Sequence, residues 1–188
     1  GSEMCIRDSY YEMPSDHIYI RPESWDKPFE APEHVCSSYD NCHVPWGSTH
    51  EKTWHLVRTL PHVSGLFVWT GFDYLGEPTP YWWPSRSSFF GIVDLAGFPK
   101  DVYYMYKSEW TDEPVLHIFP HWNWKVGEPV DIWAYYNNAD EVELYLNGKS
   151  LGVQQKTDST YHVSWRVPFT PGTLRAVSRL GGKEVLVK

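Results

Sequence analysis

The sequence predicts an α/β segment followed by an all-β segment. Residues 48–110 combine two helical patterns with a continuous apolar, β-rich run, which is the arrangement of strands and helices in a piece of an α/β barrel. From about residue 111 onward, short runs alternate polar with apolar residues and are separated by turn residues, which is typical of an immunoglobulin-like β-sandwich. We therefore expect a change of fold class near residue 111.

The elements of the α/β segment can be placed one by one. Ser48, followed three residues later by Glu51, forms a capping-box pattern and predicts a helix over residues 48–59. The apolar run 63–69 predicts a strand that is covered on both faces, as in a parallel sheet or barrel. A polar loop rich in glycine and proline follows, and a second helix is expected to begin at Pro99, whose fixed φ suits the first helical turn.

The all-β segment is predicted from five alternating runs, at residues 115–119, 130–135, 141–146, 161–167 and 174–178. Turn signals lie between them, namely Asn137-Asn138, Asn147-Gly148, Pro171-Gly172 and Gly181-Gly182. The Asn147-Gly148 pair is the strongest of these signals, because both residues accept the positive φ angles of a two-residue hairpin turn.

Composition narrows the class of ligand. The 188 residues carry a net charge of −8, which disfavours nucleic acid and anionic membrane surfaces as partners. Aromatic residues make up 17% of the chain, with 11 Trp and 13 Tyr. Flat aromatic faces suit the apolar faces of sugar rings, but β-rich proteins also pack many aromatics in their cores. No run approaches the ~20 apolar residues of a membrane span.

The cysteines and the first residues carry little information. Cys5, Cys36 and Cys42 are too few and too irregularly spaced for a disulfide framework or a zinc site, and a single bridge between Cys36 and Cys42 stays open. Residues 1–9 fit nothing downstream, and we interpret them as a non-native remnant. Residues 10–110 are expected to form the barrel portion and residues 111–188 the β-sandwich.

Three passages carry a resemblance to a known family. They are SGLFVWTGFDYLGEPTPY at residues 64–81, FGIVDLAGFPKD at residues 90–101 and VELYLNGKSLG at residues 142–152. In this order and spacing they resemble the bacterial β-galactosidases of glycoside hydrolase family 2, and the resemblance extends from Tyr10 to Lys188. It implies that residues up to about 110 supply the seventh loop, helix 7, strand 8 and helix 8 of a (β/α)₈ TIM barrel, and that the remainder is the β-sandwich that follows it.

The resemblance also implies an activity. Such enzymes are retaining exo-β-glycosidases that hydrolyse terminal β-galactosides or related β-glycosides with two carboxyl groups about 5–5.5 Å apart. The family's two glutamates would lie upstream of Tyr10, so no catalytic residue, metal ligand or cofactor is assigned here, and we expect the chain alone to be inactive. The resemblance favours a periplasmic or secreted bacterial protein, leaves oligomerisation open, and does not distinguish galactose from glucuronic acid or mannose.

Five residues are candidates for carbohydrate binding. The resemblance makes Trp69, at the end of the predicted strand, a wall of the sugar subsite; the alternative is a tryptophan packed in the barrel interior. His43 could hydrogen-bond a sugar hydroxyl, and Trp46 and Asn41 share its loop; the alternative is a solvated or packed loop. Asp73 follows the C-terminal end of the strand, where barrel active sites lie. Its alternative role is that of a hydrogen-bond acceptor that organises the loop.

A second class of function stays open. The sandwich could act as a non-catalytic carbohydrate-binding module or as a purely structural module. The aromatic turn at residues 121–124 (His-Trp-Asn-Trp) could bind a sugar, but packing against the barrel is the favoured interpretation.

Overall fold

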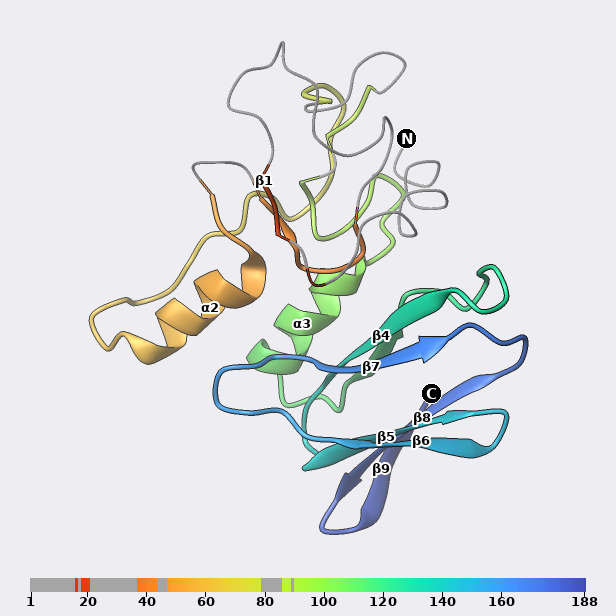
Figure 1. Ribbon diagram of the computed structural model, residues 1–188. Helices are drawn as coiled ribbons and strands as arrows, with labels where there is room; N and C mark the ends of the chain where they lie inside the picture. Colours follow the sequence, from red (N-terminus) through yellow and green to blue (C-terminus); the bar gives the residue numbers. More distant parts are fainter. Residues whose placement is uncertain (1–15, 17, 21–36, 44–46, 79–85, 89) are drawn as a thin grey trace. The chain divides into compact units, whose positions relative to one another are not determined.

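The computed structural model describes residues 16, 18–20, 37–43, 47–78, 86–88 and 90–188 (Figure 1). The chain divides into two compact units, residues 1–103 and residues 104–188. The predicted remnant at residues 1–9 lies outside the described residues, as do Trp46 and Cys36. Within the described part of the chain, no helix has the length and apolar character needed to cross a membrane.

The described residues of the first unit contain little regular structure. Their elements are a two-residue parallel pairing of β1 (Tyr19–Ile20) with β2 (Cys42–His43), the helix α2 (His50–Thr59) and the first residues of α3 (Asp101–Trp110). Both predicted helices are therefore present, each beginning about two residues later than expected.

The cap of α2 differs from the predicted one. The N-cap residue is Thr49, and its side chain makes no capping hydrogen bond. Instead, the two carboxylate oxygens of Asp40 accept hydrogen bonds from the backbone N–H groups of His50 and Glu51, at 2.8 and 2.7 Å. The prediction that Ser48 caps this helix was wrong, because the acceptor for the open N–H groups comes from ten residues upstream rather than from the flanking residue.

The buried strand predicted at residues 63–69 is absent. These residues form no strand, and the side chain of Phe67 is fully exposed at 105% while that of Trp69 is 75% exposed. A parallel strand bonds its N–H and C=O groups to neighbours on both sides. Among the described residues of this unit no such neighbours flank the run, so the partial TIM barrel is not seen.

The second unit is a β-sandwich of seven strands, and this part of the predicted fold is confirmed. The strands are β3 (Leu116–Phe119), β4 (Pro129–Tyr136), β5 (Glu141–Leu146), β6 (Lys149–Gln154), β7 (Val163–Pro168), β8 (Leu174–Leu180) and β9 (Lys183–Val187). They form a three-stranded sheet in the order β3-β4-β7 and a four-stranded sheet in the order β6-β5-β8-β9, and every pair is antiparallel.

Tight turns join the outer strands of the four-stranded sheet. Asn147 and Gly148 both have positive φ, at 52° and 79°, so the predicted two-residue hairpin between β5 and β6 is confirmed. Gly181 and Gly182, with φ of 56° and 78°, make the corresponding turn between β8 and β9. Because each turn spans two residues, it fixes the register of the strand residues next to it, and the register then shifts between Glu143 and Tyr145 in one pair and between Ser178 and Arg179 in the other.

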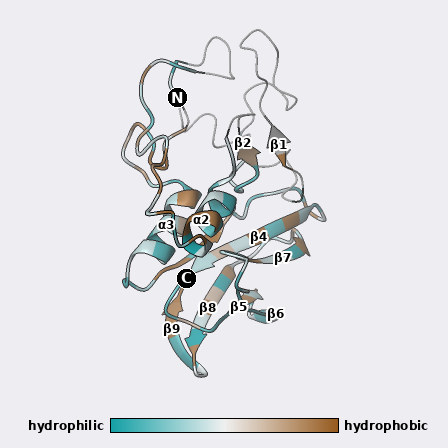
Figure 2. Cartoon of the chain, turned by 90° about the vertical axis from the view of Figure 1, so that its left-hand side faces the viewer, coloured by the Kyte–Doolittle hydropathy of each residue, from teal (hydrophilic) through white to brown (hydrophobic). Residues whose placement is uncertain are grey.

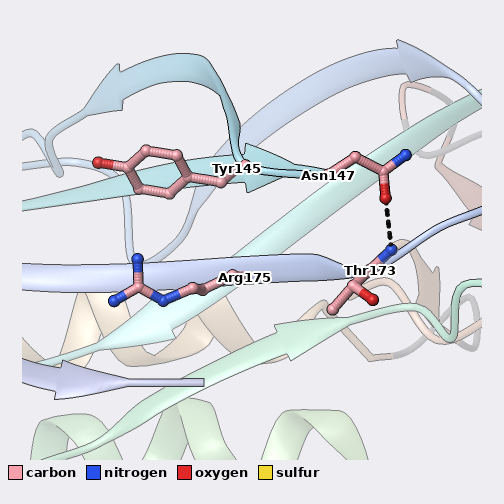
Figure 3. A pocket seen from close by; sticks show the side chains of 5 residues that line it. Tyr145, Asn147, Thr173 and Arg175 are labelled. Carbon is pink, nitrogen blue, oxygen red and sulfur yellow. Dashed lines mark hydrogen bonds between the residues drawn. The ribbon is translucent and has the colours of Figure 1, made fainter.

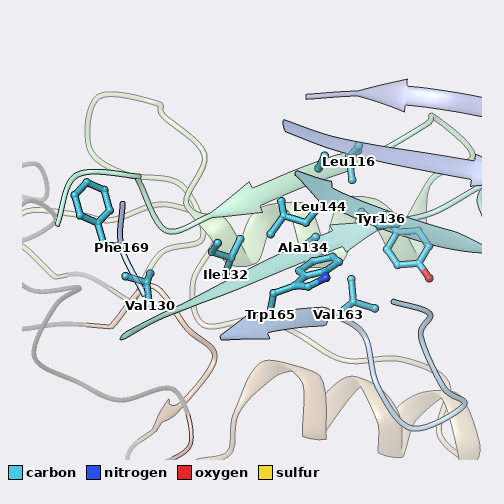
Figure 4. Packing of buried hydrophobic residues seen from close by; sticks show 11 residues of the cluster. Leu116, Val130, Ile132, Ala134, Tyr136, Leu144, Val163, Trp165 and Phe169 are labelled. Carbon is cyan, nitrogen blue, oxygen red and sulfur yellow. The ribbon is translucent and has the colours of Figure 1, made fainter. Parts of the chain in front are cut away.

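The core lies between the two sheets (Figure 4). Alternate residues of β4, from Val130 to Tyr136, belong to this core. Hydrophobic and hydrophilic stretches lie next to one another on the strands of this unit (Figure 2). The buried cluster is completed from every strand of the three-stranded sheet and from β5 and β8; it consists of Leu116, Val130, Ile132, Ala134, Tyr136, Val142, Leu144, Val163, Trp165, Phe169 and Ala176.

A second layer of aromatic contacts covers the outer face of the three-stranded sheet. Tyr104 of α3 stacks on His117 of β3, with ring centroids 3.8 Å apart. Trp133 of β4 stacks on His162 at 3.5 Å, and Phe119 contacts both Trp133 and Tyr135. Both faces of this sheet are therefore packed, which explains why Trp133 and Tyr135 are buried although they point away from the core.

Candidate functional site

Trp69 is the most exposed of the predicted site residues that the structure describes, and hydrogen bonds fix its edge. Its indole N–H donates to the hydroxyl of Tyr74, which in turn donates to the carboxylate of Glu77. The hydrogen bond to Glu77, together with a smaller effect of burial, raises the pKa of Tyr74 above its usual value. An indole that is 75% exposed yet held at its N–H offers a flat apolar face to solvent.

Asp73 is buried and has protein partners on both carboxylate oxygens. One oxygen accepts a hydrogen bond from the backbone N–H of Gly91 at 2.8 Å, and the other lies 2.7 Å from the ammonium of Lys100. A Cβ atom at Gly91 would lie 2.2 Å from the backbone nitrogen of Asp73, so only glycine fits there. This geometry is that of an acceptor that organises the loop, and direct substrate contact by Asp73 stays a prediction.

Backbone hydrogen bonds join the segment that follows Trp69 and contains Asp73 to a second loop segment, residues 90–93. Thr70 N–H donates to the carbonyl of Phe90 at 3.2 Å, and Val93 N–H donates to Gly71 at 3.1 Å. Asp73 N–H donates to Val93 at 2.9 Å. Residues 70–73 and 90–93 are thus joined side by side, and the ion pair between Asp73 and Lys100 fastens this junction to the residue before α3.

The other candidates lie on a separate segment, around β2. Asn41 is fully buried, and its backbone N–H donates to the carbonyl of Tyr39 at 2.9 Å. His43 is half-buried in β2. Beside them, burial raises the pKa of the Asp40 carboxyl, against the opposing effects of the nearby His50 charge and the two capping hydrogen bonds. The segment is organised around the start of α2, and sugar binding by Asn41, His43 and Trp46 stays a prediction.

The aromatic turn at residues 121–124 packs against the sandwich itself. The indole N–H of Trp122 donates to the carbonyl of Thr170 at 3.1 Å, and its ring contacts Phe169 with centroids 4.9 Å apart. The indole N–H of Trp124 donates to the carbonyl of His121 at 2.8 Å. Both tryptophans pack on the core cluster, so the sandwich core supplies at least part of the packing surface for this turn.

One feature of the sandwich was missed from the sequence. A pocket of about 340 Å³ lies at one end of β5 and β8, lined by Tyr145, Asn147, Gly148, Thr173 and Arg175 (Figure 3). Tyr145 and Arg175 point outward from directly opposed positions of neighbouring strands. The signal for it in the sequence is an aromatic and a cationic residue at outward positions of two alternating runs, which cannot be paired until the strand order is known.

Comparison with known proteins gives one match confined to the second unit and several that span both units. Residues 127–186 match a family described as a domain of unknown function, DUF4982. A β-galactosidase of Bacteroides ovatus is 63% identical over 95% of this chain, and a putative β-glucuronidase of Formosa agariphila is 41% identical over 88%. The crystal structure of a β-glycosidase from Bacteroides vulgatus covers 97% of the chain with a TM-score of 0.77 and 32% identity.

These relatives indicate the general class of protein to which the chain is similar. Along almost its whole length, the chain is similar to bacterial β-glycosidases. Within that class the resemblance to glycoside hydrolase family 2 is confirmed, and the chain is a relative of the family 2 β-galactosidases and β-glucuronidases. The chain spans only 21% and 16% of the length of the two curated relatives and 26% of the solved β-glycosidase.

Proposed function

We propose that the chain forms part of a retaining exo-β-glycosidase that hydrolyses terminal β-galactosides or related β-glycosides. In this proposal residues 10–110 belong to the C-terminal part of a family 2 barrel, residues 111–188 form the following sandwich, and the catalytic glutamates lie outside these residues. The 63% identity to the Bacteroides ovatus β-galactosidase, over 179 residues, carries the proposal. Four curated relatives named as β-glucuronidases have lower identity, between 29% and 42%, over 40% to 92% of the chain.

The exposed apolar residues of the first unit support a partial barrel. Phe67 and Trp69, in the run whose composition is that of a buried strand, are each more than 60% exposed, as are Phe72 and Leu75 in the loop that follows it. Single exposed apolar residues are ordinary on protein surfaces, but four in nine consecutive positions are not. Neighbouring strands of a complete barrel would cover some of them and would supply hydrogen-bond partners for residues 63–68.

The hydrogen-bonded indole of Trp69 supports a role in holding the sugar. A sugar ring has apolar C–H faces and a rim of hydroxyl groups, so an aromatic face binds it without using its hydrogen bonds. In the proposed enzyme Trp69 forms a wall of the subsite for the transferred glycosyl group. Tyr74 and Glu77 act as positioning residues, because they fix the edge of the indole without covering its faces.

Hydrolysis of nitrophenyl glycosides tests the activity. The 188-residue chain should turn over neither nitrophenyl β-galactoside nor nitrophenyl β-glucuronide, whereas a protein that includes the complete coding sequence should hydrolyse at least the galactoside. Turnover by the short chain would contradict the placement of the glutamates. If the long protein binds galactosides without turnover, the alternative of a non-catalytic carbohydrate-binding module holds instead.

Substitution of Trp69 in the long protein tests the site. Trp69→Ala should lower kcat/KM roughly ten- to a hundredfold, which corresponds to about 1–3 kcal/mol of transition-state binding, with little change in thermal midpoint. A tryptophan of the packed interior predicts the opposite, since Trp→Ala then costs about 3–5 kcal/mol of stability. The matched variant Tyr74→Phe keeps a ring but releases the indole edge, and should lower kcat/KM by a smaller factor.

A further inference from the structure

The pocket at the end of β5 and β8 has a rigid rim. The side-chain amide of Asn147 accepts a hydrogen bond from Thr173 N–H at 3.0 Å and donates one to the carbonyl of Pro171 at 3.2 Å, as Figure 3 shows in part. A Cβ atom at Gly172 would lie 1.9 Å from that amide, so the two turns meet closely. The rim is therefore formed before any ligand arrives, which reduces the entropic cost of binding.

The aromatic wall of the pocket is also fixed. The hydroxyl of Tyr145 accepts a hydrogen bond from Arg179 at 3.1 Å and donates one to the carboxylate of Glu143. Glu143 in turn accepts hydrogen bonds from Ser150 at 2.6 Å and from Arg179 at 2.7 Å, and these bonds, with that of Tyr145, lower the pKa of Glu143. The position of the Tyr145 ring is thus fixed by the hydrogen bonds of its hydroxyl group, and the carboxylate of Glu143 forms an ion pair with Arg179.

Arg175 is the cationic group of the lining, and its guanidinium makes no hydrogen bond to any residue that the structure describes. Its guanidinium lies 5.7 Å from the ring centroid of Tyr145. The facing carboxylate, that of Glu184, is 4.0 Å away, which is beyond hydrogen-bond distance, and both side chains are at least half exposed. Among the described residues no acceptor lies within hydrogen-bond distance of this guanidinium. A planar fork of five N–H donors binds a carboxylate through two parallel hydrogen bonds.

We propose that this pocket binds one sugar residue that carries a carboxylate, that is, a uronic acid unit of a saccharide. Its volume of about 340 Å³ is at the lower end of small-molecule sites, which run from about 300 Å³, and suits a single ring. Arg175 receives the carboxylate, Tyr145 supplies the apolar wall, and the hydroxyl of Thr173 lies within the lining for a sugar hydroxyl. The site is independent of the proposed catalytic function, since all its residues belong to the sandwich.

The test is a titration of the ¹⁵N-labelled 188-residue protein with methyl β-D-glucuronide, followed by NMR of the backbone amides. Shifts should be confined to residues 145–149 and 173–175. Methyl β-D-glucoside, which carries a hydroxymethyl group in place of the carboxylate, should bind at least about tenfold more weakly, because it loses a charge-assisted hydrogen-bonded pair. Equal binding of the two glycosides would overturn the proposal, as would shifts located elsewhere.

Variants assign the effect to Arg175. Arg175→Gln should weaken glucuronide binding by about tenfold or more, while amide signals away from the pocket stay in place. The control is Arg166→Gln, which removes an arginine from the other sheet, where it pairs with Asp131 through two contacts of 2.7 Å, and which should leave binding unchanged. If Arg175→Gln binds as the parent does, or if sodium acetate gives the same shifts at the same concentration, the pocket is not a uronic acid site.

Discussion

Similar apolar, β-rich sequence runs form a buried strand in the second unit but not in the first. The run 130–135 lies within β4, paired on both sides by β3 and β7, and all but one of its residues are buried. The equally apolar run 63–69 forms no strand and leaves Phe67 and Trp69 in solvent. The difference is the supply of partners, because β4 finds both of its neighbours within forty residues. An apolar β-rich run becomes a strand only where other strands complete its hydrogen bonds.

The largest expected effect separates a buried leucine from an exposed one. Leu144→Ala removes a fully buried side chain from the sandwich core and should cost about 2–5 kcal/mol of unfolding free energy. Leu75→Ala removes a side chain that is 78% exposed in the first unit and should change it by less than about 0.5 kcal/mol. Urea denaturation measures both, and equal losses would remove the contrast between the units.

The second effect compares two ion pairs. Asp73→Asn removes the negative charge that lies 2.7 Å from the mostly buried ammonium of Lys100 and should cost about 2 kcal/mol in the stability of the first unit. Asp131→Asn breaks the pair with Arg166 on the sandwich, whose arginine side chain is 57% exposed, and should cost less, about 1 kcal/mol. Hydrogen exchange of residues 70–76 and 90–94 reports the first change. Unaltered protection in Asp73→Asn would show that the ion pair does not fasten these loops.

The third effect concerns the start of α2. Asp40→Ala removes the acceptor for two backbone N–H groups and should cost about 1 kcal/mol of helix stability, measured by hydrogen exchange of the first turn. Ser48→Ala, at the position that the sequence pattern indicates as the cap, should have no effect. If Ser48→Ala destabilised the helix and Asp40→Ala did not, Ser48 would be the capping residue, as the sequence pattern predicts.

The smallest effect is a dependence on pH. Burial lowers the pKa of His121 below its usual value of 6.5. Because the folded state then binds a proton less readily than the unfolded chain, the contribution of this group is fully present above about pH 6.5 and is lost as the pH falls. His121→Asn should reduce the slope of stability against pH below 6.5. A slope unchanged from the parent would mean that His121 is not the titrating group.

Local signals in the sequence predicted the sandwich well. Alternation over residues 141–146 and the Asn147-Gly148 turn define a strand and a hairpin without reference to distant residues. The failures involve groups brought together over longer distances. The cap of α2 comes from Asp40, the partner of Asp73 is Lys100, and the pocket joins Tyr145 to Arg175. The strand at residues 63–69 failed for the same reason, since a strand needs pairing partners and the described residues of the first unit supply none.

The hydrogen bond from the Asn147 side chain to the carbonyl of Pro171 makes the sandwich sensitive to chemical modification of Asn147. Asn-Gly is the dipeptide most prone to spontaneous deamidation, because the unhindered backbone nitrogen of the glycine attacks the carbon of the side-chain amide. Ammonia leaves, and water opens the resulting succinimide to aspartate or isoaspartate. Conversion of Asn147 to aspartate would replace the N–H that donates to the Pro171 carbonyl with a carboxylate oxygen that repels it, while the hydrogen bond from Thr173 would persist. One slow reaction at one residue would therefore loosen the hairpin and the rim of the pocket together.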